Sequence, residues 1–248
     1  MNELPTSHWQ QWRILIAGLL GIPVMLLMDS PVGDALFVHG QALATLLVFL
    51  VYMVAYKKST RRVRQVMLIG LVVGMSGEVF FSLIMGMYHY RLGNVPLWVA
   101  FGHGLIFAYV FRMAHKDWLK SNQQVIQQAL LAFAILYSLF WLWWANDWYG
   151  LLCTVVFIAI LFTAKKSRLF FLIMFAVVCY IEQVGTAVQC WYWPATLLNQ
   201  PGWLPSGNPP SGIGVFYFLF DAAVLWTYLY LLHPKTRHRY RAMILNRS

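Results

Sequence analysis

The sequence predicts an all-α integral membrane protein whose eight transmembrane helices form two parallel four-helix repeats. Three observations lead to this fold class. The 248-residue chain is 60% hydrophobic and only 10% charged, whereas soluble domains average about 25% charged residues. Apolar runs of about 18 residues or more, the length that crosses a bilayer, recur along the chain. All of the 18 Lys and Arg except Arg91 fall in segments that eight spans place on one side of the membrane.

The charge pattern predicts the location of the protein. Basic loops face the cytoplasm by the positive-inside rule, so we expect a multi-pass protein of a bacterial-type cell inner membrane with both termini cytoplasmic. The net charge of +10 lies in these loops, which favours membrane lipids rather than nucleic acid as the partner. We expect the first helix to be retained and not cleaved as a signal peptide, because no small-residue cleavage pattern follows Met28. The cysteines lack paired spacing and a CxxC, so neither disulfides nor a zinc site is expected.

The first repeat is expected to cover residues 1–120. After a short polar N-terminal segment, its spans are predicted over 13–28, 35–56, 66–87 and 96–114. Residues 29–34 are expected to form a turn, because Pro and Gly break helices and Asp caps them. The basic run 57–62 ends the second span on the cytoplasmic side, and the aromatic residues of 88–94 indicate an external loop at the membrane interface.

The second repeat is expected to cover residues 121–248, ending in a basic cytoplasmic tail. Its spans are predicted over 125–144, 148–164, 169–189 and 213–232. Trp residues at the end of the first of these spans are typical of a membrane interface. Residues 190–212, rich in Trp, Pro, Gly and Asn, form a longer external loop. Each half has an even number of spans, so the halves share one orientation and are parallel repeats.

Three ordered anchors indicate the duplication. Glu78 precedes Tyr88 by ten residues, and Glu182 precedes Tyr192 by the same spacing. The other two anchors are a Lys-Lys-Ser at a cytoplasmic helix end and a Gly-Asn-x-Pro before the last span of each half. Their copies are Lys57-Lys58-Ser59 with Lys165-Lys166-Ser167, and Gly93-Asn94-Val95-Pro96 with Gly207-Asn208-Pro209-Pro210.

Four ionisable residues inside the apolar segments are the candidate catalytic residues. At 1.5 Å of rise per residue, Glu78 and Glu182 lie about 15 Å below the external boundary, His103 roughly 10 Å and Asp221 roughly 16 Å. A carboxylate at that depth costs about 3 kcal/mol, so these groups are expected to face inward and pair. A cluster that only locks the helix packing is the alternative. We prefer a functional site, because ionisable residues inside membranes usually mark one.

Seven residues nearer the external side are candidates for substrate binding. Aromatic rings there either anchor the interface or stack on a ligand, and the two Asn residues either cap the following helix or help to capture an anion. His39, expected four residues into the second span, would line an opening from outside or simply sit at the interface. The seven are His39, Tyr88, Tyr90, Asn94, Tyr192, Trp193 and Asn208. No metal is assigned, because no HxxxH, HxxE or DxxD lies on any one helix.

Part of this pattern resembles the integral-membrane carotenoid hydratases. A Glu, then an aromatic-x-aromatic pair, then a Gly/Pro helix start carries the likeness. The matching residues are Glu78, Tyr88, Tyr90, Gly93 and Pro96 in the first half, with Glu182, Trp191 and Trp193 in the second. The Glu-to-aromatic spacing is shorter here than in that family, and the loop before Pro209 differs. The resemblance implies hydration of a polyene as one possible reaction.

Three functions remain open on these residues. The first is intramembrane acid–base chemistry on a lipid or isoprenoid, of the hydratase, isomerase or hydrolase type, with Glu78 and Glu182 as the acid–base pair and His103 and Asp221 assisting. The second is a small proton-coupled transporter that uses the same carboxylates for a lipid-phase small molecule or ion. The third is a scaffold subunit whose polar cluster fixes helix register. The cofactor and the oligomeric state are left unassigned.

Overall fold

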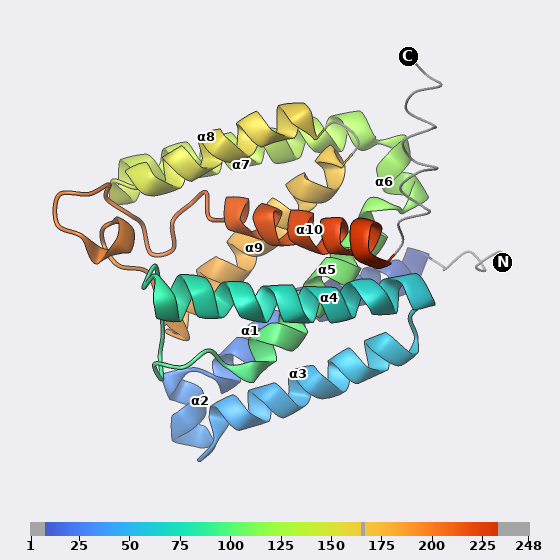
Figure 1. Ribbon diagram of the computed structural model, residues 1–248, viewed down its shortest axis with the longest axis horizontal. Helices are drawn as coiled ribbons and strands as arrows, with labels where there is room; N and C mark the ends of the chain where they lie inside the picture. Colours follow the sequence, from blue (N-terminus) through green and yellow to red (C-terminus); the bar gives the residue numbers. More distant parts are fainter. Residues whose placement is uncertain (1–7, 165–166, 233–248) are drawn as a thin grey trace.

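Helices arranged lengthwise beside one another form almost the whole of the computed structural model, which describes residues 8–164 and 167–232 (Figure 1). The N-terminal segment before residue 8 and the predicted basic tail from 233 lie outside the described residues. The helices of the first half are α1 (His8–Met28), α2 (Pro31–Leu36), α3 (Gly40–Lys57), α4 (Arg61–Glu78) and α5 (Leu97–Ala114). Those that follow are α6 (Asp117–Ser121), α7 (Gln123–Ala145), α8 (Trp148–Thr163), α9 (Arg168–Ala187) and α10 (Gly214–Thr227).

Short irregular elements complete the chain. A π-helix, Val79–Ile84, continues α4, and a second, Tyr228–Leu232, continues α10. Strand β1 (His89–Tyr90) follows the first π-helix, and strand β2 (Trp191–Tyr192) follows α9. The loop between β2 and α10 includes one 3₁₀ turn, Leu197–Asn199.

Six helices of the described part of the chain are long and apolar enough to cross a membrane, which agrees with an all-α membrane protein. They are Gly40–Lys57, Arg61–Ile84, Leu97–Ala114, Gln123–Ala145, Arg168–Ala187 and Gly214–Leu232. Two further apolar stretches, Gly18–Met28 and Trp148–Thr163, are shorter. The count of eight spans therefore stays a prediction.

The predicted turn at 29–34 and the helix start at residue 35 are wrong. Ser30 begins the short helix α2, because its side-chain oxygen accepts a hydrogen bond from Gly33 N at 3.2 Å and Pro31 suits the first helical turn. The chain then becomes extended at Phe37, and α3 begins only at Gly40. His39 therefore precedes the helix instead of lying inside it.

Four helices surround the centre of the molecule. Within the halves, α4 packs on α5 and α9 packs on α10. Between the halves, α4 packs on α10, α5 packs on α9, and β1 pairs with β2 in antiparallel fashion. Each contact between halves thus has a counterpart with the roles of the halves exchanged, as a two-fold repeat would produce; the repeat itself stays a prediction.

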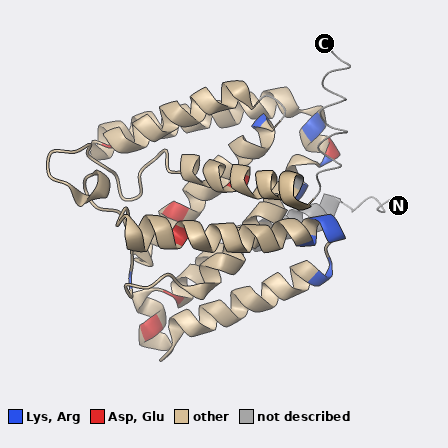
Figure 2. Ribbon diagram, in the orientation of Figure 1, with Lys and Arg blue, Asp and Glu red and all other residues tan. Residues whose placement is uncertain are grey.

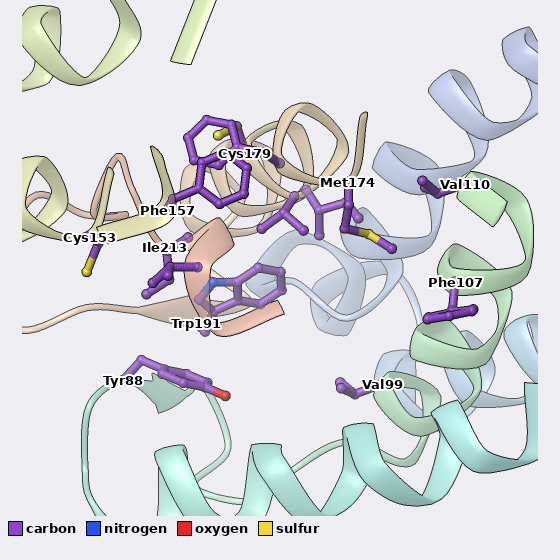
Figure 3. Close-up of a cluster of buried hydrophobic side chains, with 14 of the residues drawn as sticks. Tyr88, Val99, Phe107, Val110, Cys153, Phe157, Met174, Cys179, Trp191 and Ile213 are labelled. Atoms are coloured by element: carbon purple, nitrogen blue, oxygen red, sulfur yellow. The ribbon is translucent and has the colours of Figure 1, made fainter. Parts of the chain in front are cut away.

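Charge is distributed unequally along the bundle. Lys and Arg gather at the end formed by α6 and the start of α4, away from the loop that carries β2 (Figure 2). Arg91 lies apart from them, beside Asp29 and Asp34. The core between these ends is apolar and aromatic, with Trp191, Ile213, Tyr88 and Val99 around its middle (Figure 3). The orientation in the membrane stays a prediction.

Candidate functional site

Glu78 is held by three hydrogen-bonding side chains. The hydroxyl groups of Tyr88 and Tyr90 both donate to its Oε2, the second at 2.7 Å, and His103 Nε2 lies 2.8 Å from Oε1. The side chain is only 4% exposed. Its cost of burial is therefore offset by partners on both carboxylate oxygens.

Glu182 has a related but less complete set of partners. The indole Nε1 groups of Trp191 and Trp193 donate to its Oε2 at 2.8 and 3.1 Å. Oε1 makes no hydrogen bond to any side chain or backbone group of the described residues. Glu182 is as buried as Glu78, at 5% exposure, so one oxygen of a buried carboxyl group remains without a protein partner.

The paired strands explain how four aromatic side chains reach the two carboxylates. Successive residues of a strand point to opposite faces. Tyr88 and Tyr90, which flank His89, therefore both point inward. Trp191 and Trp193, which flank Tyr192, do the same. The register pairs Tyr90 with Trp191 and His89 with Tyr192. The inward rings interleave across the halves, Tyr88 on Trp193 at 4.6 Å and Tyr90 beside Trp191 at 6.0 Å.

Trp191 is a site residue that the substrate-binding candidates lacked. The ten-residue Glu–Tyr spacing aligned Tyr192 with Tyr88, but Tyr192 is 52% exposed and stacks on His89 outside the site. The inward aromatic pair of the second half lies one residue closer to its glutamate than the pair that follows Glu78. The aromatic pair Trp191 and Trp193, which carries the resemblance to the hydratases, occupies the inward positions.

His103 reaches Glu78 because α4 and α5 approach closely. A Cβ at Gly74 would overlap the His103 ring, and a Cβ at Gly70 would lie 3.5 Å from the Cα of Gly104. Such small residues let two membrane helices come together. The glycines on α4 thus make the room in which the imidazole lies against the carboxylate.

A cavity of about 60 Å³ is lined by both Glu78 and Glu182. One water needs at least about 10–15 Å³ on this measure, so a few waters or a small part of a larger molecule fit. Half of its lining residues are aromatic. The aromatic lining residues are Phe81, Tyr88, Tyr90, Trp98, Trp191, Trp193, Phe216, Tyr217 and Phe220.

Tyr217 is a second lining residue absent from the candidates. It stacks on the His103 ring at 5.3 Å, and its hydroxyl forms no hydrogen bond to another described residue. The lining positions of α10 repeat the spacing of those of α5. The positions that correspond are Val99 with Ile213, Gly102 with Phe216, His103 with Tyr217, and Ile106 with Phe220. The second half therefore has a phenol where the first has an imidazole.

Asp221 does not line the main cavity with the two glutamates. It is 5% exposed, and its Oδ2 has no hydrogen-bond partner in the part of the chain that the structure describes. The side chain faces a smaller cavity, whose polar lining residues are Asp221, His103 and Tyr217. The structure therefore brings Glu78, Glu182 and His103 together and places Asp221 behind the His103–Tyr217 pair.

Two buried aspartates hold the connecting loops near the site. Asp29, after α1, accepts hydrogen bonds from Trp98 Nε1 at 2.6 Å and from Arg91 at 3.3 Å. Asp147, after α7, accepts backbone N–H bonds from Gly150, Gly207 and Ser211 at 2.7–2.9 Å. Both aspartates were expected only in connecting segments, although a carboxylate after the first helix of each half is a signal that the sequence contains.

The remaining predicted binding residues lie away from the cavity. His39 is exposed, and Asn94 is exposed with its side chain bonded to Gln41 at 2.9 Å. Asn208 accepts a hydrogen bond from Trp193 N at 3.0 Å, so it positions the loop. Neither Asn caps the following helix, because α5 and α10 have Pro96 and Ile213 at their N-caps without a side-chain bond.

The hydroxyl groups of Tyr88 and Tyr90 stay protonated and act as hydrogen-bond donors. Burial, followed by the nearby Glu78 carboxylate, raises the pKa of Tyr88 and of Tyr90 well above the ordinary value of 10. Both phenols therefore keep their protons at physiological pH and donate hydrogen bonds to Glu78. Over the described residues, no group of three or more His, Cys, Asp and Glu side chains is arranged to hold a metal ion.

Comparisons with known proteins give no further assignment: no family model, no curated protein and no solved structure matches this chain.

Proposed function

We propose that this protein catalyses acid–base chemistry at a carbon–carbon double bond of an isoprenoid or similar lipid, either adding water or moving the bond. The observation that carries the proposal is the asymmetry of the two carboxyl groups at one aromatic cavity. Glu78 has partners on both oxygens, whereas Glu182 has a free Oε1. Pairs of carboxyl groups in different environments are a recurring way to separate an acid from a base.

In the proposed reaction Glu182 is the general acid. A proton on its Oε1 is transferred to one alkene carbon, which leaves a carbocation on the other. Aromatic faces stabilise a cation through their quadrupoles, and Trp, Tyr and Phe make up half of the residues that line the cavity. The cation is formed where such faces surround it on several sides.

Glu78 with His103 is the proposed base. In hydration, a water adds its oxygen to the cation and gives one proton to this pair, so the alkene and water become an alcohol. In isomerisation, the pair removes a proton from a neighbouring carbon and the double bond moves. Return of that proton to Glu182 completes either cycle, and Tyr217 supplies a hydroxyl to orient the water.

The seam between α4 and α10 is the proposed opening for a lipid chain. Phe81, on the π-helix after Glu78, lies 4.9 Å from Phe216 and 5.8 Å from Phe220, and all three rings line the cavity. Apolar residues beside Phe81 on that π-helix are exposed, with Leu83 at 53% and Ile84 at 70%. Single π-helical turns occur often at functional sites, and the rings can swing aside without breaking a hydrogen bond.

A proton-coupled transporter is the second candidate. The observation in its favour is the second cavity with Asp221, which places a further carboxylate behind His103. Intramembrane acidic and His residues in a row are typical of proton paths. A transporter would show substrate uptake that disappears when the pH gradient is removed, which an alkene-modifying enzyme would not.

The test compares lipid and pigment extracts of cells that carry the wild-type gene, a deletion, Glu182→Gln or Glu78→Gln. The control is Asp117→Asn, the same carboxylate-to-amide change on the exposed helix α6. One precursor should accumulate in the deletion and both Glu variants but not in the control. A mass difference of one water between precursor and product identifies hydration, and equal masses identify isomerisation. Identical extracts from all strains, with folded variants present in the membrane, would refute the proposal.

A further inference from the structure

Asp221 is the most conspicuous unsatisfied group among the described residues. Its side chain is 5% exposed, and Oδ2 is buried without a hydrogen-bond partner. Leaving a buried polar atom unpaired costs about 1–3 kcal/mol, more if it is charged. Native proteins usually satisfy such groups, with ordered water where no protein group is near.

The cavity beside Asp221 is large enough for that water. Its volume is about 10 Å³, close to the space that a single water needs. Its other polar side chains are His103 and Tyr217, and the rest of the wall is apolar. A water there has two to three polar partners, the number that buried waters typically have.

The hydrogen bonds of His103 leave one ring nitrogen for such a water. Nε2 lies 2.8 Å from Glu78 Oε1, so it carries the hydrogen that the carboxylate accepts. Nδ1 forms no hydrogen bond to a described residue, although the imidazole also lines the Asp221 cavity. A bridging water satisfies Nδ1 and Asp221 Oδ2 together by donating one hydrogen to each.

We propose that one water occupies this second cavity and bridges Asp221 to His103, which makes Asp221 the positioning residue of the Glu78–His103 pair. The bridge fixes the ring orientation and the tautomer in which Nε2 bears the hydrogen. Phe107 of α5 also lines this cavity, and its apolar ring offers the water no alternative hydrogen-bond partner. The inference deepens the proposed function, because it concerns the proposed base, but its test needs no substrate.

The test is nitrogen NMR of the histidine side chains in the full chain, reconstituted in lipid nanodiscs. Among the seven His residues, His103 is identified as the one whose signal disappears in His103→Gln. Asp221→Leu removes the acceptor for the water, Asp221→Asn keeps the volume and one acceptor oxygen, and Asp117→Leu is the control on exposed α6.

We expect Asp221→Leu to shift the Nδ1 signal of His103 while the Nε2 signal, held by Glu78, stays in place. Asp221→Asn should keep Nδ1 near its wild-type position, and the control should change neither signal. An unchanged Nδ1 in Asp221→Leu, or equal shifts in the Leu and Asn variants, would overturn the bridge. If the Leu variant does not fold, a wild-type-like Nδ1 in the Asn variant still supports the bridge, and a shifted one refutes it. None of these outcomes depends on whether the lipid comparison finds a product.

Discussion

A methyl group added at Gly185 tests how the second carboxylate site is built. Gly185 lies on α9 one turn after Glu182, and a Cβ there would overlap the six-membered ring of Trp191. The indole has little freedom to move away, because it is 6% exposed, bonded to Glu182 at 2.8 Å and 6.0 Å from the Tyr90 ring. Gly185→Ala therefore either overpacks the site or breaks the Trp191–Glu182 bond.

The expected magnitude follows from a matched control. Gly102→Ala adds the same methyl to α5 with no atom within 4 Å, so it receives only the helix-propensity gain of about 1 kcal/mol. Overpacking costs about 1–3 kcal/mol, and losing a hydrogen bond to a charged group costs about 1.5–3 kcal/mol. Gly185→Ala should therefore be about 1–3 kcal/mol less stable than Gly102→Ala.

The assay is reversible unfolding in mixed detergent micelles, followed by tryptophan fluorescence. A double-mutant cycle with Trp191→Phe isolates the contact. The shorter Phe ring leaves room for the methyl, so Gly185→Ala should cost less in the Trp191→Phe background than in the wild type. Equal stability of Gly185→Ala and Gly102→Ala, or no coupling in the cycle, would refute the packing of Trp191 on α9.

The two anchoring aspartates give further predictions. Asp147→Asn places an amide nitrogen among three backbone N–H donors. The free energy of unfolding should therefore fall by about 1–3 kcal/mol. A stability equal to that of Asp117→Asn would contradict the anchoring role of Asp147. Burial, only partly opposed by hydrogen bonds from Trp98, Arg91 and Gln41, raises the pKa of Asp29 above its ordinary value of 3.8. The folded protein then binds this proton more tightly than the unfolded chain, so the stabilisation is present below pH 3.8 and is lost as pH rises through the raised pKa. Unfolding free energies measured from acid to neutral pH should fall for the wild type relative to Asp29→Asn, and a relative rise would contradict the shift.

The order of helices and the position of the first carboxylate followed from the sequence because long apolar runs and buried charge are strong signals. The helix boundaries near Ser30 were predicted wrongly, because a Ser-Pro pair can start a new helix as well as end the preceding one. Trp191 was not among the binding candidates, because the equal Glu–Tyr spacing aligned Tyr192 with Tyr88 and the alternation of side chains along a strand was not considered. A one-residue change of register exchanges the inward and outward faces of a strand.

Other site residues left too little signal in the sequence. Tyr217 lies in the apolar run of α10 among other aromatic residues, and only its packing on His103 distinguishes it. Asp221 lies inside α10, as the predicted span 213–232 implied, but position along one helix does not say which neighbour a side chain faces. The His103–Tyr217 pair that separates Asp221 from the glutamates depends on tertiary packing.

The different donors at the two carboxylates bear directly on the proposed roles. A phenol donates and accepts hydrogen bonds, and an imidazole exchanges protons at two nitrogens, whereas an indole N–H only donates. Glu78 therefore belongs to a network through which a proton can move away. Glu182 is held on one oxygen by indoles that cannot take its proton, and its other oxygen has no partner among the described residues. A proton on that oxygen can be transferred only to a molecule in the cavity, which is what a general acid requires. Changing Trp191 and Trp193 to the tyrosines of the first half would give Glu182 phenol partners on Oε2, through which its proton could leave, and on this reasoning it would weaken the division between acid and base.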